Sequence, residues 1–153
     1  MCHARRYFCN RLMDRTSYIL PYSERQRLHN QAYDAQQRNH FEVCGVLIIG
    51  FNKRVALWFL KNRSRQPYRY KLNITDIITV QHRIAVYDQH ILGTFHSHPV
   101  SEAIPGHGDL ENGFFNGVEM IYDVCACEAR LWCVKKYQGV LITKELPLCL
   151  ESR

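Results

Sequence analysis

The sequence contains no apolar run long enough to cross a bilayer. Its longest uninterrupted apolar stretch, "VALWFL" at 55–60, has the length of a strand, whereas a membrane-spanning helix needs about 20 apolar residues. The N-terminal segment "MCHARRYFCNRLMDR" is basic but lacks the apolar core of a secretory signal. Internal repeats and low-complexity linkers are also missing. We therefore expect a cytoplasmic protein without a membrane partner.

The composition is that of an ordinary globular domain. The 153 residues are 46% hydrophobic and 22% charged, and a chain of this length can bury a substantial core. We expect a lead-in over residues 1–17, one domain over 18–148 and a C-terminal tail over 149–153.

The cysteines do not form an even framework of the kind that disulfide-stapled domains show. There are seven, an odd number, and most lie in apolar stretches, where a free cysteine behaves as a small hydrophobic residue. We therefore expect reduced thiols in a reducing compartment.

Acidic residues are absent between Lys53 and Thr75, although this stretch contains seven lysines and arginines of a chain with net charge +6. One interpretation is a patch for an anionic partner such as nucleic acid. The other is a solvated loop and strand edge, where lysines discourage pairing between sheets. No nucleic-acid-binding motif accompanies the charge.

The hydrophobic patterns predict one mixed α/β domain. A short strand "SYILP" precedes a helix to about Arg38, with "SERQ" at 23–26 as its capping box. The runs "VCGVLIIGF" and "RVALWFLKN" predict a hairpin. A second helix, capped by Asn73, precedes the strand "ILGTFH". After a short helix to about Asn116, "EMIYDVCAC", "ARLWCVKKY" and "VLITKEL" complete the expected strands.

The stretch "HSHPVSEAIPGHGD" at 96–109 carries a candidate metal site. His96 and His98 are two residues apart at a strand end, so their side chains point to the same face. The loop that follows could return Asp109 to the same point. Two imidazoles and one carboxylate leave a fourth tetrahedral position open, as in catalytic zinc sites. Zinc would lower the pKa of a water there and polarise a carbonyl.

Such a site needs a general base that is not a ligand. Glu42 lies at the start of "EVCGVLIIG", where its carboxylate could take a proton from the water and pass it to a leaving amine.

These residues resemble the JAMM (JAB/MPN-plus) zinc metallopeptidases. The resemblance rests on Glu42 with glycine three residues later, the apolar run to Gly50, and "HSHP" spaced from an aspartate. It also includes "FLKNRSRQPYRY" and Trp132, and covers about residues 18–148. It implies a cytidine-deaminase-like α/β/α sandwich, a Zn²⁺ ion held by His96, His98 and Asp109, and Glu42 as acid/base.

The resemblance also implies a reaction and a partner. Members as short as this chain are similar to the stand-alone prokaryotic forms. The expected activity is hydrolysis of the amide or isopeptide bond after the C-terminal glycine of a ubiquitin-like or sulfur-carrier protein.

One position departs from the family pattern. The family usually has a serine three residues before the metal-binding aspartate, and here that position is Gly106. Losing an oxyanion donor costs on the order of 10²- to 10³-fold in rate. A binding scaffold without turnover is therefore one alternative. A nucleic-acid-associated protein of the DNA-repair-linked branch, which also carries an "HxHP" element, is a second.

Overall fold

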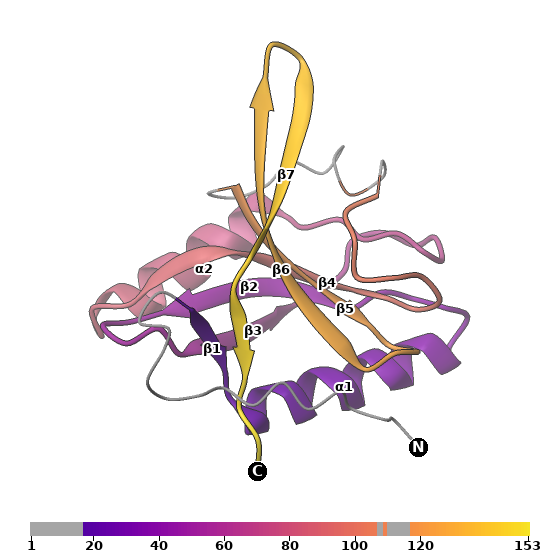
Figure 1. Cartoon of the computed structure of the whole chain (residues 1–153), viewed down its shortest axis with the longest axis horizontal. Helices are drawn as coiled ribbons and strands as arrows, with labels where there is room; N and C mark the ends of the chain where they lie inside the picture. The colour runs from indigo at the N-terminus through magenta and orange to yellow at the C-terminus, as the bar shows by residue number, and fades with distance from the viewer. Residues whose placement is uncertain (1–16, 107–108, 110–116) are drawn as a thin grey trace.

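The computed structural model of the chain describes residues 17–106, 109 and 117–153. The elements, in chain order, are β1 (Tyr18–Leu20), α1 (Tyr22–Gln37), β2 (Cys44–Ile49), β3 (Val55–Leu60), α2 (Ile74–Ala85), β4 (His90–His98), β5 (Val118–Asp123), β6 (Glu128–Tyr137), β7 (Val140–Leu146) and β8 (Leu148–Leu150). Figure 1 shows their arrangement. Among the residues described, no helix combines the length and apolar character that a membrane span requires.

The centre of the fold is a six-stranded mixed sheet in the order β3-β2-β4-β5-β6-β7. Only β4 and β5 are parallel, and the other neighbouring pairs are antiparallel. The two short strands β1 and β8 form a separate parallel pair. The predicted hairpin of β2 and β3 is therefore confirmed, and β4, which carries both candidate histidines, lies inside the sheet.

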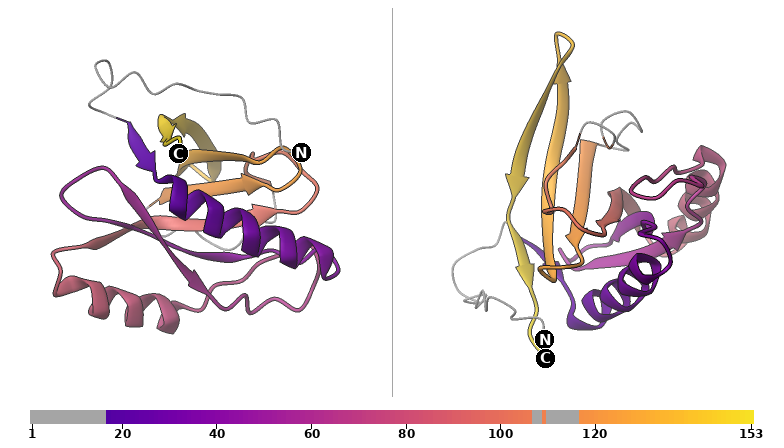
Figure 2. Two further views of the ribbon diagram at one scale, coloured as in Figure 1. Left: turned by 90° about the horizontal axis from the view of Figure 1, so that it is seen from below. Right: turned by 90° about the vertical axis from the view of Figure 1, so that its right-hand side faces the viewer.

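The two helices cover opposite faces of the sheet (Figure 2). Leu28 and Ala32 of α1 join a core with the side chains of one face, including Leu47 and Phe95. Three side chains of α2 join Val46, Ile48 and Ile91 on the other face, namely Ile77, Val80 and Ile84. The expected α/β/α sandwich around a mixed sheet is therefore confirmed.

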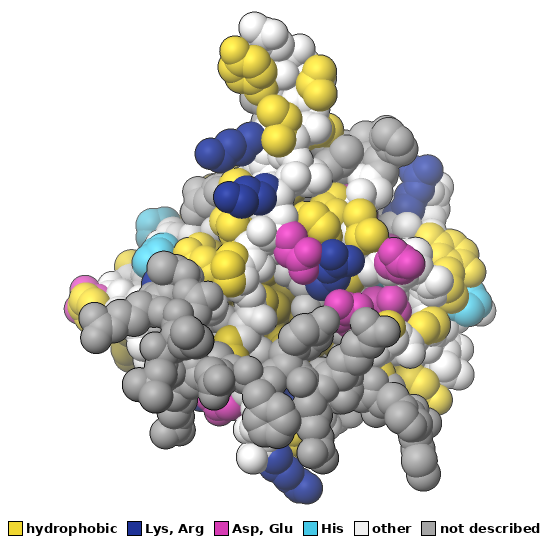
Figure 3. Space-filling model, viewed as in Figure 1, with side chains coloured by type: hydrophobic (Ala, Val, Ile, Leu, Met, Phe, Trp, Pro, Cys, Tyr) yellow, Lys and Arg dark blue, Asp and Glu magenta, His cyan; other side chains and the backbone are white. Residues whose placement is uncertain are grey.

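The antiparallel hairpin of β6 and β7 projects from the body, and apolar side chains gather at its end (Figure 3). Tyr137, Val140 and Ile142 are each more than half exposed there. Strand β7 is also one edge of the sheet. The second edge is β3, where the carboxylate of Glu24 on α1 accepts a 2.7 Å hydrogen bond from the N–H of Leu57.

The helix ends match the sequence in one case and differ in the other. The Asn73 side chain accepts a 2.9 Å hydrogen bond from the N–H of Thr75, as predicted for the cap of α2. The predicted capping box of α1 is wrong. That helix begins two residues earlier than a cap at Ser23 implies, at Tyr22, with Pro21 as N-cap and no side-chain cap. Proline already holds the φ angle that a helix start requires, so Ser23 falls inside the first turn.

The cysteines are only partly as expected. Cys44, Cys125 and Cys133 are free thiols. Cys127 and Cys149 are disulfide-bonded, so the prediction of reduced thiols is wrong at these two positions. Cys125 and Cys127 also lie in the turn between β5 and β6 and not on a strand.

Candidate metal site

The two histidines of "HSHP" lie at the end of β4, and both belong to the strand. Both residues are buried, at 0% exposed for His96 and 7% for His98. The alternation of a strand points both imidazoles to one face, and their Nε2 atoms lie 3.0 Å apart. The geometry predicted for this pair is therefore present.

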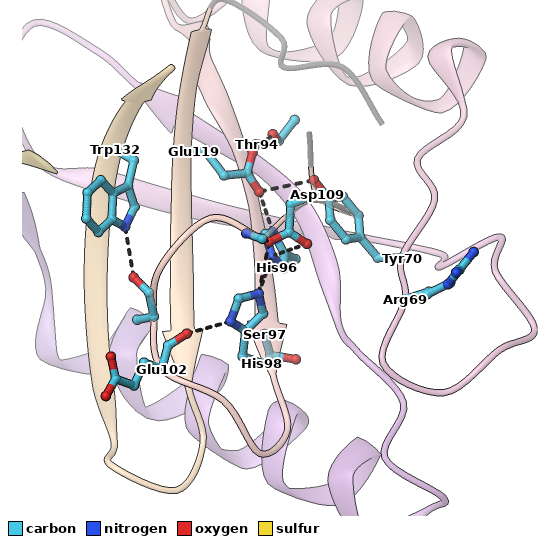
Figure 4. Close-up of polar contacts among 12 residues, drawn as sticks. Arg69, Tyr70, Thr94, His96, Ser97, His98, Glu102, Asp109, Glu119 and Trp132 are labelled. Carbon is cyan, nitrogen blue, oxygen red and sulfur yellow. Dashed lines mark hydrogen bonds and ion pairs between the residues drawn. The ribbon is translucent and has the colours of Figure 1, made fainter. Parts of the chain in front are cut away.

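Asp109 lies against both imidazoles, although it is eleven residues beyond His98 (Figure 4). One carboxylate oxygen is 3.1 Å from Nε2 of His98, and the other is 3.2 Å from Nε2 of His96. A tetrahedral zinc ion with bonds of 2.0–2.1 Å would separate its ligand atoms by about 3.3 Å. The three side chains therefore form a buried donor set of the size and chemistry that fits zinc.

The second nitrogen of each imidazole has its own acceptor. Nδ1 of His98 lies 2.6 Å from the backbone carbonyl oxygen of Glu102. The loop carrying that carbonyl is fixed by the indole N–H of Trp132, which donates a 2.8 Å hydrogen bond to the carbonyl of Ala103. A metal-ligating histidine usually donates its other N–H in this way, which fixes the ring and its tautomer.

The corresponding acceptor for His96 is Glu119, which no pattern in the sequence indicated as a site residue. Nδ1 of His96 contacts Oε1 of this fully buried carboxylate. The phenol ring of Tyr70 stacks on the His96 imidazole with ring centroids 4.2 Å apart and an interplanar angle of 15°. Glu119 is a lone acidic residue in the apolar run "GVEMIY", and this could have indicated a buried carboxylate. No local pattern, however, shows that His96 is the residue it contacts.

Glu42 lies just before β2, whose first residue, Cys44, pairs with His96 on β4. Its side chain is 5% exposed, and Oε2 has no hydrogen-bond partner among the described residues. Burial raises the pKa of Glu42 to about 7, although the nearby charges of His96 and His98 oppose the increase. A carboxyl group that titrates near neutral pH suits a general base.

The segment that carries Glu42 is held from two sides. The Ser97 hydroxyl accepts a 2.9 Å hydrogen bond from the N–H of Val43. On the other side, the amide of Asn62 donates a 2.9 Å hydrogen bond to the carbonyl of Glu42 itself. These bonds position the backbone of Glu42 relative to the histidine strand.

Gly45 explains why glycine stands three residues after Glu42. A Cβ atom at this position would lie 2.1 Å from the carbonyl oxygen of Trp58 and 2.7 Å from the ring of Phe95. Only glycine allows β2 to pack this closely between its neighbours.

Gly106 lies beside the donor set, but its N–H is already used. It donates a 2.7 Å hydrogen bond to Oδ2 of Asp109, and so orients that carboxylate. A Cβ at position 106 would lie 3.5 Å from the same oxygen, which is an ordinary contact. His107, a neighbouring side chain that could replace the missing serine hydroxyl, lies outside the described residues. Ser97 points to Val43 instead.

The ionisable groups of the site strongly change one another's pKa values. Burial alone would lower the pKa of His96, but hydrogen bonds with Asp109 and Glu119 outweigh it and raise this pKa to about 10. Burial alone would raise the pKa of Asp109, but hydrogen bonds with His96 and His98 hold it well below its usual range. A proton and a divalent cation therefore compete for the same group of atoms.

Cys44, two residues after Glu42, does not have the properties of a nucleophile. Burial, assisted by the charge of Glu42, raises the pKa of its thiol to about 12. The reactive thiolate is therefore disfavoured at neutral pH, and Cys44 acts as part of the core, as expected from its apolar neighbours.

Comparison with known proteins identifies the fold and the family. The solution structure of protein DSY2949 from Desulfitobacterium hafniense has a TM-score of 0.71 at 19% identity, and the match covers 89% of this chain and 94% of that one. AF2198, a JAB1/MPN domain protein from Archaeoglobus fulgidus, has a TM-score of 0.49 at 16% identity over 88% of this chain and 99% of that one. The similarity to DSY2949 shows the fold alone.

Sequence comparison gives a curated relative and a family. A desampylase from Pyrococcus furiosus is 29% identical over 70 residues, which are 46% of this chain and 50% of that protein. The match thus spans half the length of the relative. The family described as prokaryotic homologs of the JAB domain matches residues 25–135, well over half of the chain. The chain therefore belongs to the prokaryotic JAB-domain family.

Proposed function

We propose that this chain is a zinc-dependent peptidase or isopeptidase. The observation that carries the proposal is the buried donor set of His96, His98 and Asp109, with a non-ligating carboxyl group, Glu42, within electrostatic reach. The partly matching desampylase supports the class of reaction.

The roles of the side chains follow from their chemistry. His96, His98 and Asp109 would hold the ion, which when bound supplies an activated water and polarises a carbonyl. Glu42 accepts a proton from the attacking water and donates it to the nitrogen of the leaving amine. In the metal-free protein burial raises the pKa of Glu42 to about 7, and the positive charge of a bound ion would favour the ionised form that accepts the proton.

The partner we propose is a ubiquitin-like or sulfur-carrier protein with a C-terminal glycine tail. An extended tail can add to a sheet edge through main-chain hydrogen bonds. The nearer edge is β3, because its last residue, Leu60, pairs with Cys44, and Cys44 pairs in turn with His96. This edge would place the bond after the terminal glycine near Glu42.

The test is cleavage of a ubiquitin-like protein fused through its C-terminal glycine to a second protein, with zinc-loaded enzyme. We expect product from the wild type and none from His98→Ala. His82→Ala, which changes an exposed histidine on α2, should cleave like the wild type. Undiminished cleavage by His98→Ala would show that the donor set is not needed.

A second candidate is a binding scaffold with the same fold and little turnover. Gly106 favours this candidate, because glycine has no hydroxyl to stabilise an oxyanion. Its backbone N–H already donates a hydrogen bond to Asp109. Gly106→Ser separates the two, because the added side chain has room. A gain of 10²- to 10³-fold, the effect of an oxyanion donor, would favour the scaffold, whereas a gain of less than about tenfold would favour the hydrolase.

The nucleic-acid alternative has weaker support. Within the basic segment, Arg54 forms an ion pair with Glu151 and Arg63 with Asp76, as a solvated surface would. Binding of duplex DNA that falls steeply with added salt would support this alternative, and no binding at low salt would remove it.

A further inference from the structure

Glu119 is a buried acid for which the proposed reaction has no use. It lies on β5, opposite Thr94 of β4 and Trp132 of β6, and its side chain is 0% exposed. An unpaired carboxylate in such a position would be strongly destabilising. The contacts of Glu119 must therefore stabilise its carboxylate in the middle of the sheet.

Three groups converge on this carboxylate (Figure 4). The hydroxyl of Tyr70 lies 3.3 Å from Oε1, and the hydroxyl of Thr94 contacts Oε2. The third contact is between Nδ1 of His96 and Oε1. An ionised carboxylate only accepts hydrogen bonds, so both hydroxyls and Nδ1–H donate to it. Nε2 of His96 is then directed to the side where His98 and Asp109 lie, and its lone pair becomes available to a metal ion when the ring gives up its Nε2 proton.

The two histidines are thus held by different means. His98 donates to a backbone carbonyl, that of Glu102, which no substitution removes. His96 depends on a side chain from another strand, and the stacked ring of Tyr70 limits its rotation. A substitution of Glu119 can therefore change the orientation of His96 without altering any of the three candidate ligands.

We propose that Glu119 is a positioning residue for the metal site. It holds the His96 ring with Nε2 toward the ion and, through the charge-assisted bond to Nδ1–H, makes this nitrogen a stronger ligand. This inference rests on the metal site of the proposed function, but not on hydrolysis. The competing explanation is structural: the carboxylate merely satisfies the buried hydroxyls of Tyr70 and Thr94.

The experiment compares Glu119→Gln with wild type in two measurements. Zinc affinity is measured by competition with a chromophoric chelator, and the imidazole N–H resonances of the zinc-loaded protein are measured by ¹H–¹⁵N NMR. Positioning predicts a dissociation constant higher by about 10- to 100-fold. It also predicts that the His96 Nδ1–H resonance shifts while that of His98, bonded to a carbonyl, stays in place.

The control is Glu145→Gln, which makes the same chemical change on β7, where Glu145 pairs with Arg130 at the surface. It should leave zinc affinity and both resonances unchanged. Glu119→Gln with wild-type affinity and an unmoved His96 resonance would overturn the inference. So would loss of affinity with both histidine resonances displaced together, because this pattern indicates general disruption of the fold.

A second variant covers the case in which Glu119→Gln does not fold. Tyr70→Phe keeps the stacked ring but removes the hydroxyl that shares Oε1 with His96. The carboxylate should then bind Nδ1–H more strongly, so the His96 resonance should shift and the His98 resonance should not. An unmoved His96 resonance contradicts the inference.

The outcomes separate this inference from the proposed function. A wild type that binds zinc but cleaves no fusion protein would refute the hydrolase and leave the role of Glu119 intact. Cleavage by a Glu119→Gln protein with unaltered zinc affinity would refute only the positioning role. A wild type that binds no zinc would overturn both.

Discussion

Ser97 and Val43 join the histidine strand to the segment that carries Glu42. The Ser97 hydroxyl accepts a 2.9 Å hydrogen bond from the N–H of Val43, and the N–H of Ser97 donates a 3.0 Å bond to the carbonyl of Val43. The serine between the two histidines is 0% exposed. It therefore positions the proposed base relative to the proposed ligands.

Ser97→Ala should weaken this connection without removing a ligand. The N–H of Val43, a half-buried residue, loses its acceptor. An unsatisfied donor that is fully buried costs about 1–3 kcal/mol of unfolding free energy, so we expect a loss at the lower end of this range. Zinc content should be retained while cleavage falls. Urea unfolding, elemental analysis and cleavage of the fusion protein measure these three effects, with Ser101→Ala, at an exposed position, as control. Equal stabilities of the two variants would contradict this role.

Replacing both histidines with alanine should abolish metal binding. We expect about one zinc per chain in the wild type and almost none in His96→Ala/His98→Ala, by elemental analysis after dialysis. His82→Ala/His90→Ala removes two exposed histidines and should keep the metal. Equal zinc content in the two double variants would mean that the ion binds elsewhere.

Glu42→Gln should stabilise the metal-free protein at neutral pH. The pKa of Glu42 rises from 4.5 to about 7 on folding, so the folded state binds the extra proton between these values. This contribution is fully present below pH 4.5 and is lost as the pH rises to about 7. The loss is on the order of 3 kcal/mol, and glutamine, which does not titrate, avoids it.

The measurement is urea unfolding with chelator at several pH values between 4.5 and 8. The advantage of Glu42→Gln over wild type should grow with pH and level off above about 7. A constant difference across this range would show that the pKa of Glu42 is not raised. The same variant should keep zinc and lose about 10²- to 10⁴-fold in cleavage.

Gly45→Ala should be strongly destabilising. The new methyl group would lie 2.1 Å from the carbonyl oxygen of Trp58, which is backbone and has little freedom to move. We expect a loss of about 3 kcal/mol or more in urea unfolding. Gly50→Ala is the matched control, because its nearest neighbour, Gln89, is 3.7 Å away. Similar stabilities for both variants would show that β2 has more room than the structure indicates.

Local patterns in the sequence predicted most of the elements. The β2–β3 hairpin, the Asn73 cap and the late strands follow from alternation and turn chemistry, which act over a few residues. His96 and His98 share a face because a strand has a period of two, so their convergence also follows from local geometry. The proximity of Asp109 and Glu42 was inferred from the family resemblance and the chemistry of the residues.

The helix faces show where local reasoning was insufficient. In the sequence, Ile74, Ile77, Ile78 and Ile84 fall at helical spacing, which predicts that all four lie on the apolar stripe of α2. Ile74 and Ile78 are instead 59% and 50% exposed, while Val80 is buried. The part of a helix that is covered depends on how it crosses the sheet, and short-range periodicity does not contain this information.

The sequence alone determined which side chains could form a metal site, because ligand chemistry and strand period are properties of a few adjacent residues. Only the tertiary structure decided what surrounds them. Glu119 lies 23 residues from His96 along the chain, and Tyr70 reaches both through a loop. Pairing between strands and packing of loops bring these groups together, and burial then gives their charges and hydrogen bonds their strength.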